Sequence, residues 1–295
     1  MSTNNETENF EQLLGEMRPK LHRYCARMVG CTIDGEDIAQ DAAIKALAAY
    51  SSTGVLDNPR AWIFRIAHNT ALDFLRRRMR EPLMNDEADL DLIAAPDTPD
   101  PEIAATCLRS FMLLPTLQRS AVLLKDVLGH SLEETAAIIG SSEVAAKSAL
   151  QRGRERLRSL ANEPEASAIP APEAIDAATL DRLAAYVIGF KSGDFDAVRA
   201  MLAEDVRLDL VSKLKRRGKS EVGDYFGAYA VNKQWRFALG MVEQRAAMLV
   251  FDSRVSTDIP AYFVGIEFDG DRVIAIRDFL YARYAMEGIN IQIIE

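Results

Sequence analysis

Two proline-rich stretches without hydrophobic periodicity divide this chain and set the number of domains it can form. Residues 81–102 contain four prolines and eight acidic residues, and no lysine or arginine. Residues 161–174 contain three prolines among alanine, serine and glutamate. Stretches of this kind are typical of tethers between folded domains. The sequence therefore predicts three folded blocks, which are residues 10–80, 103–160 and 175–290.

The composition is that of a soluble globular protein. Of the 295 residues 48% are apolar and 27% charged, and no run approaches the ~18 consecutive apolar residues of a membrane span. The first residues are polar and acidic, which predicts no signal peptide. Because the three cysteines cannot all pair, we expect a reducing compartment and a cytoplasmic location.

The distribution of charge matters more than its total. A net charge of −9 would argue against a nucleic-acid partner. Residues 60–80, however, carry six arginines and one acidic residue, and residues 147–158 carry five basic residues and one acidic residue. Two basic helices of this kind favour binding to a polyanion.

A helix predicted over residues 34–50 has two distinct faces. Its apolar face is formed, at helical spacing, by Ala39, Ala43, Leu47 and Tyr50. The opposite face carries, at i, i+3, i+4 and i+7, Asp37, Gln40, Asp41 and Ile44.

The next helix begins at a capping residue, Asn58, followed by Pro59, and is predicted to extend to Arg80. One stripe of this helix combines an aromatic ring, an amide and cations. Its members are Trp62, Arg65, Asn69, Asp73, Arg76 and Arg80. Such groups suit single-stranded DNA, whose bases stack on rings and whose phosphates pair with cations. On geometry alone, a core tryptophan beside a solvated arginine row explains the pattern equally well.

The second block contains the signature of a helix-turn-helix. Ser131 and Glu134 form a capping box, Gly140 marks a turn, and a basic helix follows from Glu143. An ordinary helical hairpin with a charged surface is the alternative. The residues that the second helix would present to DNA are Ser142, Lys147 and Ser148 near base edges, Gln151 on the adjacent polar stripe, and Arg152 and Arg154 toward phosphates.

Both blocks resemble the extracytoplasmic-function sigma factors of the sigma-70 superfamily. The run DGEDIAQDAAIKAL, followed by NPRAWIFRIAHNTALDFLRRRMR, resembles region 2 of that family. The run LLPTLQRSAVLLKDVLGHSLEETAAIIGSSEVAAKSALQRGRERLR resembles region 4. The two lie in the family's order and cover about residues 34–80 and 108–158. The resemblance implies a bacterial RNA polymerase sigma factor, with core polymerase and promoter DNA as partners and with no catalytic residue and no cofactor.

The resemblance also implies a role for each matched residue. Residues that would dock on core polymerase are Asp37, Gln40, Asp41 and Ile44. Residues that would open and read the −10 element are Trp62, Arg65, Asn69 and Asp73, followed along the backbone by Arg76, Arg77, Arg78 and Arg80. Residues 142–154 match the helix that reads the −35 element, and residues 81–102 match the tether between the regions.

The third block is predicted to be an α+β domain. Two amphipathic helices precede apolar runs with turn signals, including the hairpin turn Asp269-Gly270-Asp271. The block resembles the SnoaL-like family, a cone-shaped barrel of curved sheet and helices around a cavity. Enzymes of that fold use a carboxylate base with histidine or tyrosine partners. All three histidines here precede residue 131, which leaves Asp209 and Asp278 as candidates without a constellation. We therefore expect no enzyme activity, with a small ligand in the cavity as a further candidate partner.

Three hypotheses follow. The first is a sigma factor tuned by its SnoaL-like domain through a contact within the chain, for which basic residues 213–219 and acidic residues 81–102 are candidates. The second is a stand-alone helix-turn-helix regulator. The third is a SnoaL-like isomerase or cyclase fused to a DNA-binding domain. A metal site is not expected, because the spacing of His22, Cys25 and Cys31 fits no common zinc pattern.

Overall fold

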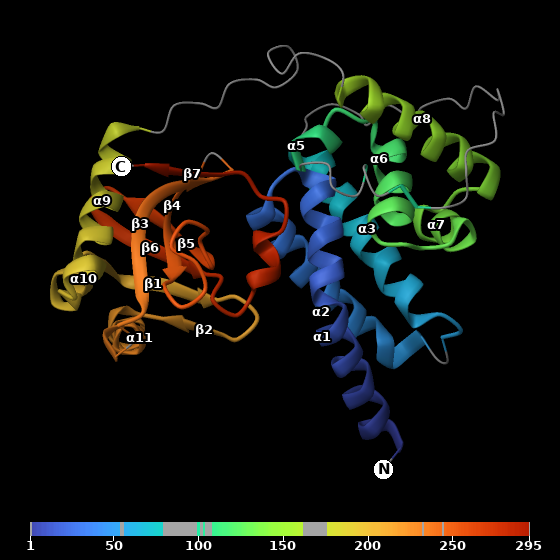
Figure 1. Cartoon of the computed structure of the whole chain (residues 1–295). Helices are drawn as coiled ribbons and strands as arrows, with labels where there is room; N and C mark the ends of the chain where they lie inside the picture. The colour runs from blue at the N-terminus through green and yellow to red at the C-terminus, as the bar shows by residue number, and fades with distance from the viewer. Residues whose placement is uncertain are drawn as a thin grey trace. The chain divides into compact units, whose positions relative to one another are not determined.

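The computed structural model describes residues 2–53, 56–78, 99–100, 103, 108–161, 176–231, 233–243 and 245–294. The chain divides into two compact units, Met1–Ile169 and Pro170–Glu295 (Figure 1). The first two predicted blocks therefore belong to one unit and the third block to the other. Among the described residues, no helix is both long and apolar enough to cross a membrane.

The N-terminal unit is helical. Its elements in chain order are α1 (Ser2–Val29), α2 (Thr32–Thr53), α3 (Pro59–Arg78), α5 (Leu108–Phe111), α6 (Thr116–Val122), the π-helix η1 (Leu123–Val127), α7 (Leu132–Ile139) and α8 (Glu143–Ala161). The predicted start of α3 is confirmed, because the Asn58 Oδ1 atom accepts a hydrogen bond from the Ala61 amide at 3.0 Å. The predicted capping box and Gly140 turn of α7 are also confirmed, with Gly140 in the left-handed conformation at φ 72°.

Helices α1 and α2 cross closely, and this crossing decides which side of α2 is buried. A Cβ atom added at Gly35 would lie only 2.4 Å from the Ala26 Cα, so the backbones are nearly in contact there. The buried apolar residues of α2 are Ile38, Ala39, Ala42 and Ala46. The buried face is rotated about the helix axis from the predicted apolar face, so Leu47, which was predicted to be in the core, is 37% exposed.

The second block packs against the first through α1 and the segment before α6. The buried guanidinium of Arg119 donates hydrogen bonds to the carbonyl oxygens of Met28, at 2.5 Å, and of Leu114, at 2.9 Å. The Met112 side chain fills the space beside Gly30, where a Cβ atom would lie 2.5 Å from the Met112 Cγ. The Met28 carbonyl of the first block therefore accepts a hydrogen bond from a buried cation of the second block.

The C-terminal unit is the predicted α+β domain. Its elements are α9 (Ala177–Ser192), α10 (Phe195–Ala200), β1 (Leu202–Leu210), β2 (Leu214–Arg217), α11 (Lys219–Val231), β3 (Trp235–Val242), β4 (Arg245–Asp252), β5 (Tyr262–Asp269), β6 (Arg272–Asp278), the 3₁₀ helix η2 (Arg283–Met286) and β7 (Ile291–Ile294). The strands form one seven-stranded sheet in the order β2-β1-β6-β5-β4-β3-β7 (Figure 1). The β1–β6 pair is parallel and the other pairs are antiparallel.

The predicted hairpin turn joins β5 to β6. Asp269 pairs with Arg272, so Gly270 and Asp271 form the turn, and Gly270 has a positive φ of 51°. The centre of the sheet is buried on both faces, since consecutive residues 247–252 of β4 and 262–264 of β5 are all buried, and α9 packs on β3 and β4.

Candidate nucleic-acid interface

Helix α3 presents most of its predicted stripe to solvent. Arg65, Asn69, Asp73 and Arg76 are exposed, and Asp73 pairs with Arg76 at 3.0 Å. Trp62 is half-buried and lies 6.2 Å from the Phe10 ring, between centroids. The tryptophan therefore shares features of both interpretations, because one part of the ring packs in the core and the other part reaches the surface.

The arginines at the end of α3 continue this surface. Arg76 and Arg77 are exposed, and the Arg77 Nε donates to the Asp73 carbonyl at 3.2 Å. Arg78 forms an ion pair with Asp34 at 2.9 Å. Arg80 lies outside the described residues.

The predicted docking face of α2 is partly exposed. Asp41 and Ile44 are open to solvent, and the Ile44 side chain is 59% exposed. Asp37 and Gln40 are half-buried. An exposed isoleucine and carboxylate on one helix face provide the mixed apolar and acidic surface that a protein partner contacts.

The start of α8 presents polar groups. Ser142 is exposed and caps the helix, its Oγ accepting from the Ala145 amide at 3.2 Å. Lys147, Ser148, Gln151 and Arg152 are half-buried. The Gln151 amide donates to Glu155 at 3.1 Å.

Arg154 does not lie on this surface. Its side chain is 2% exposed, and its Nε and Nη2 atoms lie 2.9 and 2.5 Å from the two carboxylate oxygens of Asp126 in η1. The prediction that Arg154 contacts phosphate is wrong. Arg154 lies four residues after Leu150 and three before Leu157, which places it on the packed face of α8. There the bidentate ion pair with Asp126 balances its charge.

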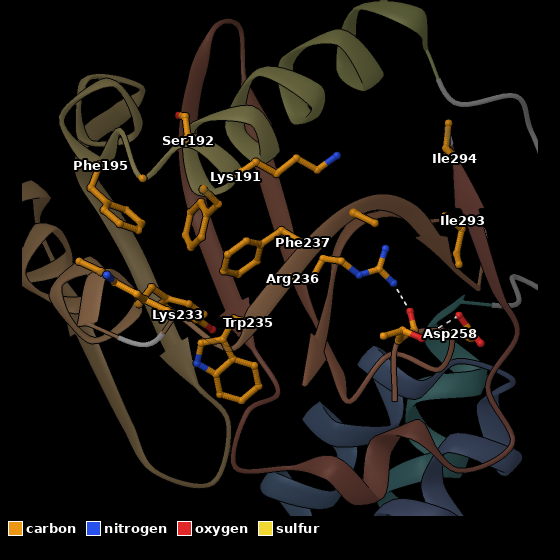
Figure 2. Close-up of a pocket in the computed structure, with 16 residues that line it drawn as sticks. Lys191, Ser192, Phe195, Lys233, Trp235, Arg236, Phe237, Asp258, Ile293 and Ile294 are labelled. Atoms are coloured by element: carbon orange, nitrogen blue, oxygen red, sulfur yellow. Dashed lines mark hydrogen bonds between the residues drawn. The ribbon is translucent and has the colours of Figure 1, made fainter. Parts of the chain in front are cut away.

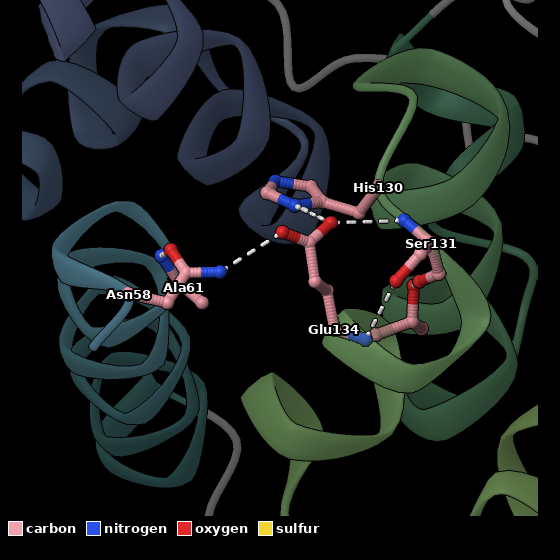
Figure 3. A network of polar contacts seen from close by, with 6 residues as sticks. Asn58, Ala61, His130, Ser131 and Glu134 are labelled. Atoms are coloured by element: carbon pink, nitrogen blue, oxygen red, sulfur yellow. Dashed lines mark hydrogen bonds and ion pairs between the residues drawn. The ribbon is translucent and has the colours of Figure 1, made fainter.

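A polar network joins the start of α3 to the start of α7 (Figure 3). The Asn58 Nδ2 donates to the Glu134 Oε1 at 3.0 Å, while the Glu134 Oε2 accepts from the Ser131 amide at 3.0 Å. The hydrogen bond from the Ser131 amide is the main cause that lowers the pKa of the Glu134 carboxyl. One ionised carboxylate thus caps α7 and holds α3.

His130 completes this network. Its Nδ1 lies 3.4 Å from the Glu134 Oε2, and its ring meets Phe64 edge-on at 4.8 Å between centroids. Burial lowers the pKa of His130, so the imidazole is neutral at pH 7. This contact between the blocks could not be predicted from the sequence, because only the capping box is visible as a local pattern.

The two carboxylate candidates of the C-terminal unit lie on opposite faces of the sheet. Asp278 is fully buried and accepts hydrogen bonds from the hydroxyls of Tyr225 and, at 2.6 Å, of Tyr229. Burial raises its pKa. Asp209 lies outside the core, with its Oδ2 3.7 Å from the Lys215 Nζ. It is therefore not a cavity residue.

A groove of about 900 Å³ lies where α9 and α11 end beside β3 and β7 (Figure 2). Its aromatic wall consists of Phe190, Phe195, Tyr229, Trp235 and Phe237. Asp278 is not among the lining residues, and Tyr229 alone connects its cluster to the groove. The buried carboxyl therefore does not face this space.

Groups of histidine, cysteine and carboxylates that could hold a metal are absent from the described part of the chain. His22 instead forms a hydrogen bond with the Thr32 carbonyl at 3.1 Å, and Cys25 is buried beside it in sequence.

Comparison with known proteins assigns both helical blocks to sigma-70-type proteins. The Sigma-70 region 2 model matches residues 13–81, and the Sigma-70 region 4 model matches residues 108–157. The ECF RNA polymerase sigma factor SigM of Mycobacterium tuberculosis is 34% identical over 152 residues, 51% of this chain and 76% of SigM. The chain belongs to the family of ECF RNA polymerase sigma factors.

Other similar proteins match a larger share of the chain, or its C-terminal region. SigG of Mycobacterium tuberculosis is 32% identical over 206 residues, which is 61% of this chain and 55% of SigG. The crystal structure of SigJ from the same species matches 91% of this chain and 95% of SigJ, at 20% identity and a TM-score of 0.36. Structures of a ketosteroid isomerase from Kribbella flavida and a polyketide cyclase from Pseudomonas putida, both with SnoaL-like folds, match the C-terminal region with a TM-score of 0.27 each, at 16% and 18% identity over 34% and 38% of this chain, and 75% and 97% of those chains. The predicted α+β architecture itself is confirmed by the sheet and helices described above.

Proposed function

We propose that this chain is a sigma factor that binds core RNA polymerase in the cytoplasm and directs it to promoters with −10 and −35 elements. The observation that carries the proposal is the exposed polar stripe of α3 within the segment that matches region 2. A stand-alone helix-turn-helix regulator needs no such surface on a second helix. Transcription in vitro with purified core polymerase and a genomic promoter pool tests the proposal; duplex binding without core binding would support the regulator instead.

Reading of the −10 element is assigned to α3. The exposed edge of Trp62 would stack on an unpaired base, and base stacking on an aromatic side chain contributes roughly 1–3 kcal/mol. Asn69 offers an amide to base edges, and Asp73 accepts hydrogen bonds. Arg65, Arg76 and Arg77 supply exposed cations for the phosphates.

Reading of the −35 element is assigned to the first turns of α8. Ser142 is exposed at the N-terminus of α8, which is the end that enters a major groove in helix-turn-helix proteins. Lys147 and Ser148 follow one turn later. Gln151 and Arg152 lie further along toward the backbone. Arg154 is left out of this set because it is held by Asp126.

The docking face of α2 gives a direct test. Replacing Asp41 and Ile44 together by alanine is expected to weaken binding to core polymerase by at least about tenfold, which equals ~1.4 kcal/mol. Both side chains are exposed, so the circular dichroism spectrum should not change. Binding is measured by anisotropy of the labelled chain. The matched control, Asp181→Ala with Ile188→Ala, removes an exposed acid and an exposed isoleucine from α9. Equal core binding by both variants would remove α2 from the interface.

The C-terminal unit is proposed to tune this activity without chemistry of its own. Residues 161–174 keep it at a high effective concentration beside the sigma regions. A small ligand bound in the aromatic groove would shift activity only if it binds one arrangement of the chain better than another.

Removal of the C-terminal unit after Ile169, at the boundary between the units, is expected to change transcription from a cognate promoter at least threefold. Adding residues 170–295 as a separate chain should restore the original level only weakly, because the tether no longer raises its concentration. The readout is transcript yield over a range of salt concentrations. Equal yields from the truncated and full chains at every salt concentration would show that the unit has an independent task.

A further inference from the structure

One corner of the C-terminal sheet gathers cations on its outer face. The strand register places Arg207 opposite Arg217, Lys215 opposite Asp209, and Arg277 opposite Asp209 from the other side. Directly opposite residues point to the same face of a sheet, so all five side chains share one face. The neighbouring residues Leu208 and Ile276 point the other way, into the core. We call Arg207, Lys215, Arg217 and Arg277 the basic face.

The Asp209 carboxylate pairs with two of these four cations. The Asp209 Oδ2 lies 3.7 Å from the Lys215 Nζ and 3.8 Å from the Arg277 Nε. Arg207 and Arg217 are exposed and face each other across the strand pair, and no carboxylate among the described residues pairs with either. Like charges directly opposite on neighbouring strands destabilise a sheet. The Arg207–Arg217 pair therefore costs the sheet some stability, and a bound anion would offset that cost.

The charge is concentrated in this corner and nowhere else in the unit. Residues 207–219 contain six lysines and arginines and one acidic residue. The rest of residues 170–295 contains ten basic and eighteen acidic residues. An evenly solvated surface would not separate its charges in this way.

Protection of a sheet edge explains only part of the pattern. Exposed edge strands often carry lysine and arginine, which prevent pairing with other sheets, and β2 is an edge strand. Arg207, however, lies on β1 between β2 and β6, and Arg277 lies on β6. Neither strand has a free edge along these residues, so their cations need another explanation.

We propose that the basic face binds the phosphate backbone of duplex DNA. Alternate residues of a strand repeat about every 6.6 Å and neighbouring strands lie ~4.8 Å apart, so the cations form a compact array. Duplex DNA carries about one charge per 1.7 Å of its axis, and several phosphates can meet such an array. Arginine forks bind phosphate oxygens in pairs. The inference rests on the proposed function only in choosing DNA as the polyanion, and it adds a third DNA contact to those of α3 and α8.

The test compares the salt dependence of DNA binding by the full chain and by variants. The probe is a fluorescein-labelled 40-base-pair duplex without promoter elements, titrated by anisotropy at NaCl concentrations from 25 to 200 mM. Arg207→Gln with Arg217→Gln is expected to lower the slope of log K against log [salt] by about 1.8, since each lost phosphate contact contributes about 0.9. The control, Lys191→Gln with Lys233→Gln, removes two exposed cations of the groove and should leave the slope unchanged.

A second variant separates binding from folding. Arg217→Glu places an acid opposite Arg207, so the Tm should stay level or rise while DNA affinity at 50 mM NaCl falls at least tenfold. Equal slopes for variant and control, or no duplex binding by the unsubstituted chain at 25 mM NaCl, would overturn the proposal. Tighter DNA binding by the glutamine variant would do the same, because it would show that acidic residues 81–102 occupy the face. The readout needs neither core polymerase nor a promoter, so it can succeed or fail independently of the sigma activity.

Discussion

Replacing Asp126 by alanine is expected to destabilise the N-terminal unit by about 3–5 kcal/mol. The reason is that Arg154 would keep its charge in the core without the Asp126 carboxylate that balances it, since both side chains of the pair are almost fully buried. Urea unfolding of the chain truncated after Ile169, followed by circular dichroism, measures the loss.

Two further variants make this prediction specific to a buried pair. Asp126→Leu with Arg154→Met removes both charges and should recover most of the loss, because apolar groups of similar volume replace a buried pair well. Arg158→Ala breaks the Arg158–Asp100 pair, in which the Arg158 side chain is 55% exposed, and should change stability by less than about 1 kcal/mol. If Asp126→Ala were as mild as Arg158→Ala, the pair would not support the packing of α8.

Covalent linkage of α3 to α7 is expected to abolish promoter-dependent transcription, with a loss of at least tenfold. The −10 and −35 elements lie about 25 base pairs apart, or roughly 85 Å of duplex at ~3.4 Å per base pair. In the structure, Asn58 of region 2 contacts Glu134 of region 4 directly (Figure 3). Helices held together in this way could not read both elements, so we expect the two regions to separate on promoter DNA.

The experiment replaces Asn58 and Glu134 by cysteine in a Cys107→Ser background and joins them with a short cleavable bis-maleimide. The remaining cysteines, Cys25 and Cys31, are buried and should not react. Transcription should return when the crosslink is cleaved. A control with cysteines at Ser51 and Thr53, both exposed on α2, receives the same reagent and should stay active. Full transcription by the crosslinked chain would mean that region 2 and region 4 work in the packed arrangement.

Local chemistry explains what the sequence alone predicted correctly. The capping box at Ser131, the left-handed Gly140 and the cap at Asn58 each depend on hydrogen bonds within four residues, so their residue types reveal them. The hairpin at Gly270 is local in the same sense. The exposed α3 stripe follows from helical periodicity, although periodicity could not decide how deeply Trp62 packs.

Long-range packing explains what the sequence could not predict. Arg154 is buried because it pairs with Asp126, which is 28 residues away in the sequence. Its charge alone predicted an exposed side chain. The rotated face of α2 follows from the close contact of Gly35 with α1. The strand register also decides the positions of the two carboxylates. Asp209 lies opposite Arg277, and Asp278 is the next residue along β6, so Asp209 lies on the outer face and Asp278 in the core.

The two oxygens of the Glu134 carboxylate have different partners, and this difference bears on how region 2 and region 4 can separate. The Oε1 atom binds Asn58 of the other region, whereas the Oε2 atom stays within its own helix cap. Separation at this point gives up one exposed hydrogen bond, worth about 0.5–1.5 kcal/mol, and leaves the first turn of α7 capped. We therefore expect region 4 to keep the capped start of α7 if the two regions separate on promoter DNA, and the main cost of that separation to lie in the shared apolar core and the Arg119–Met28 hydrogen bond.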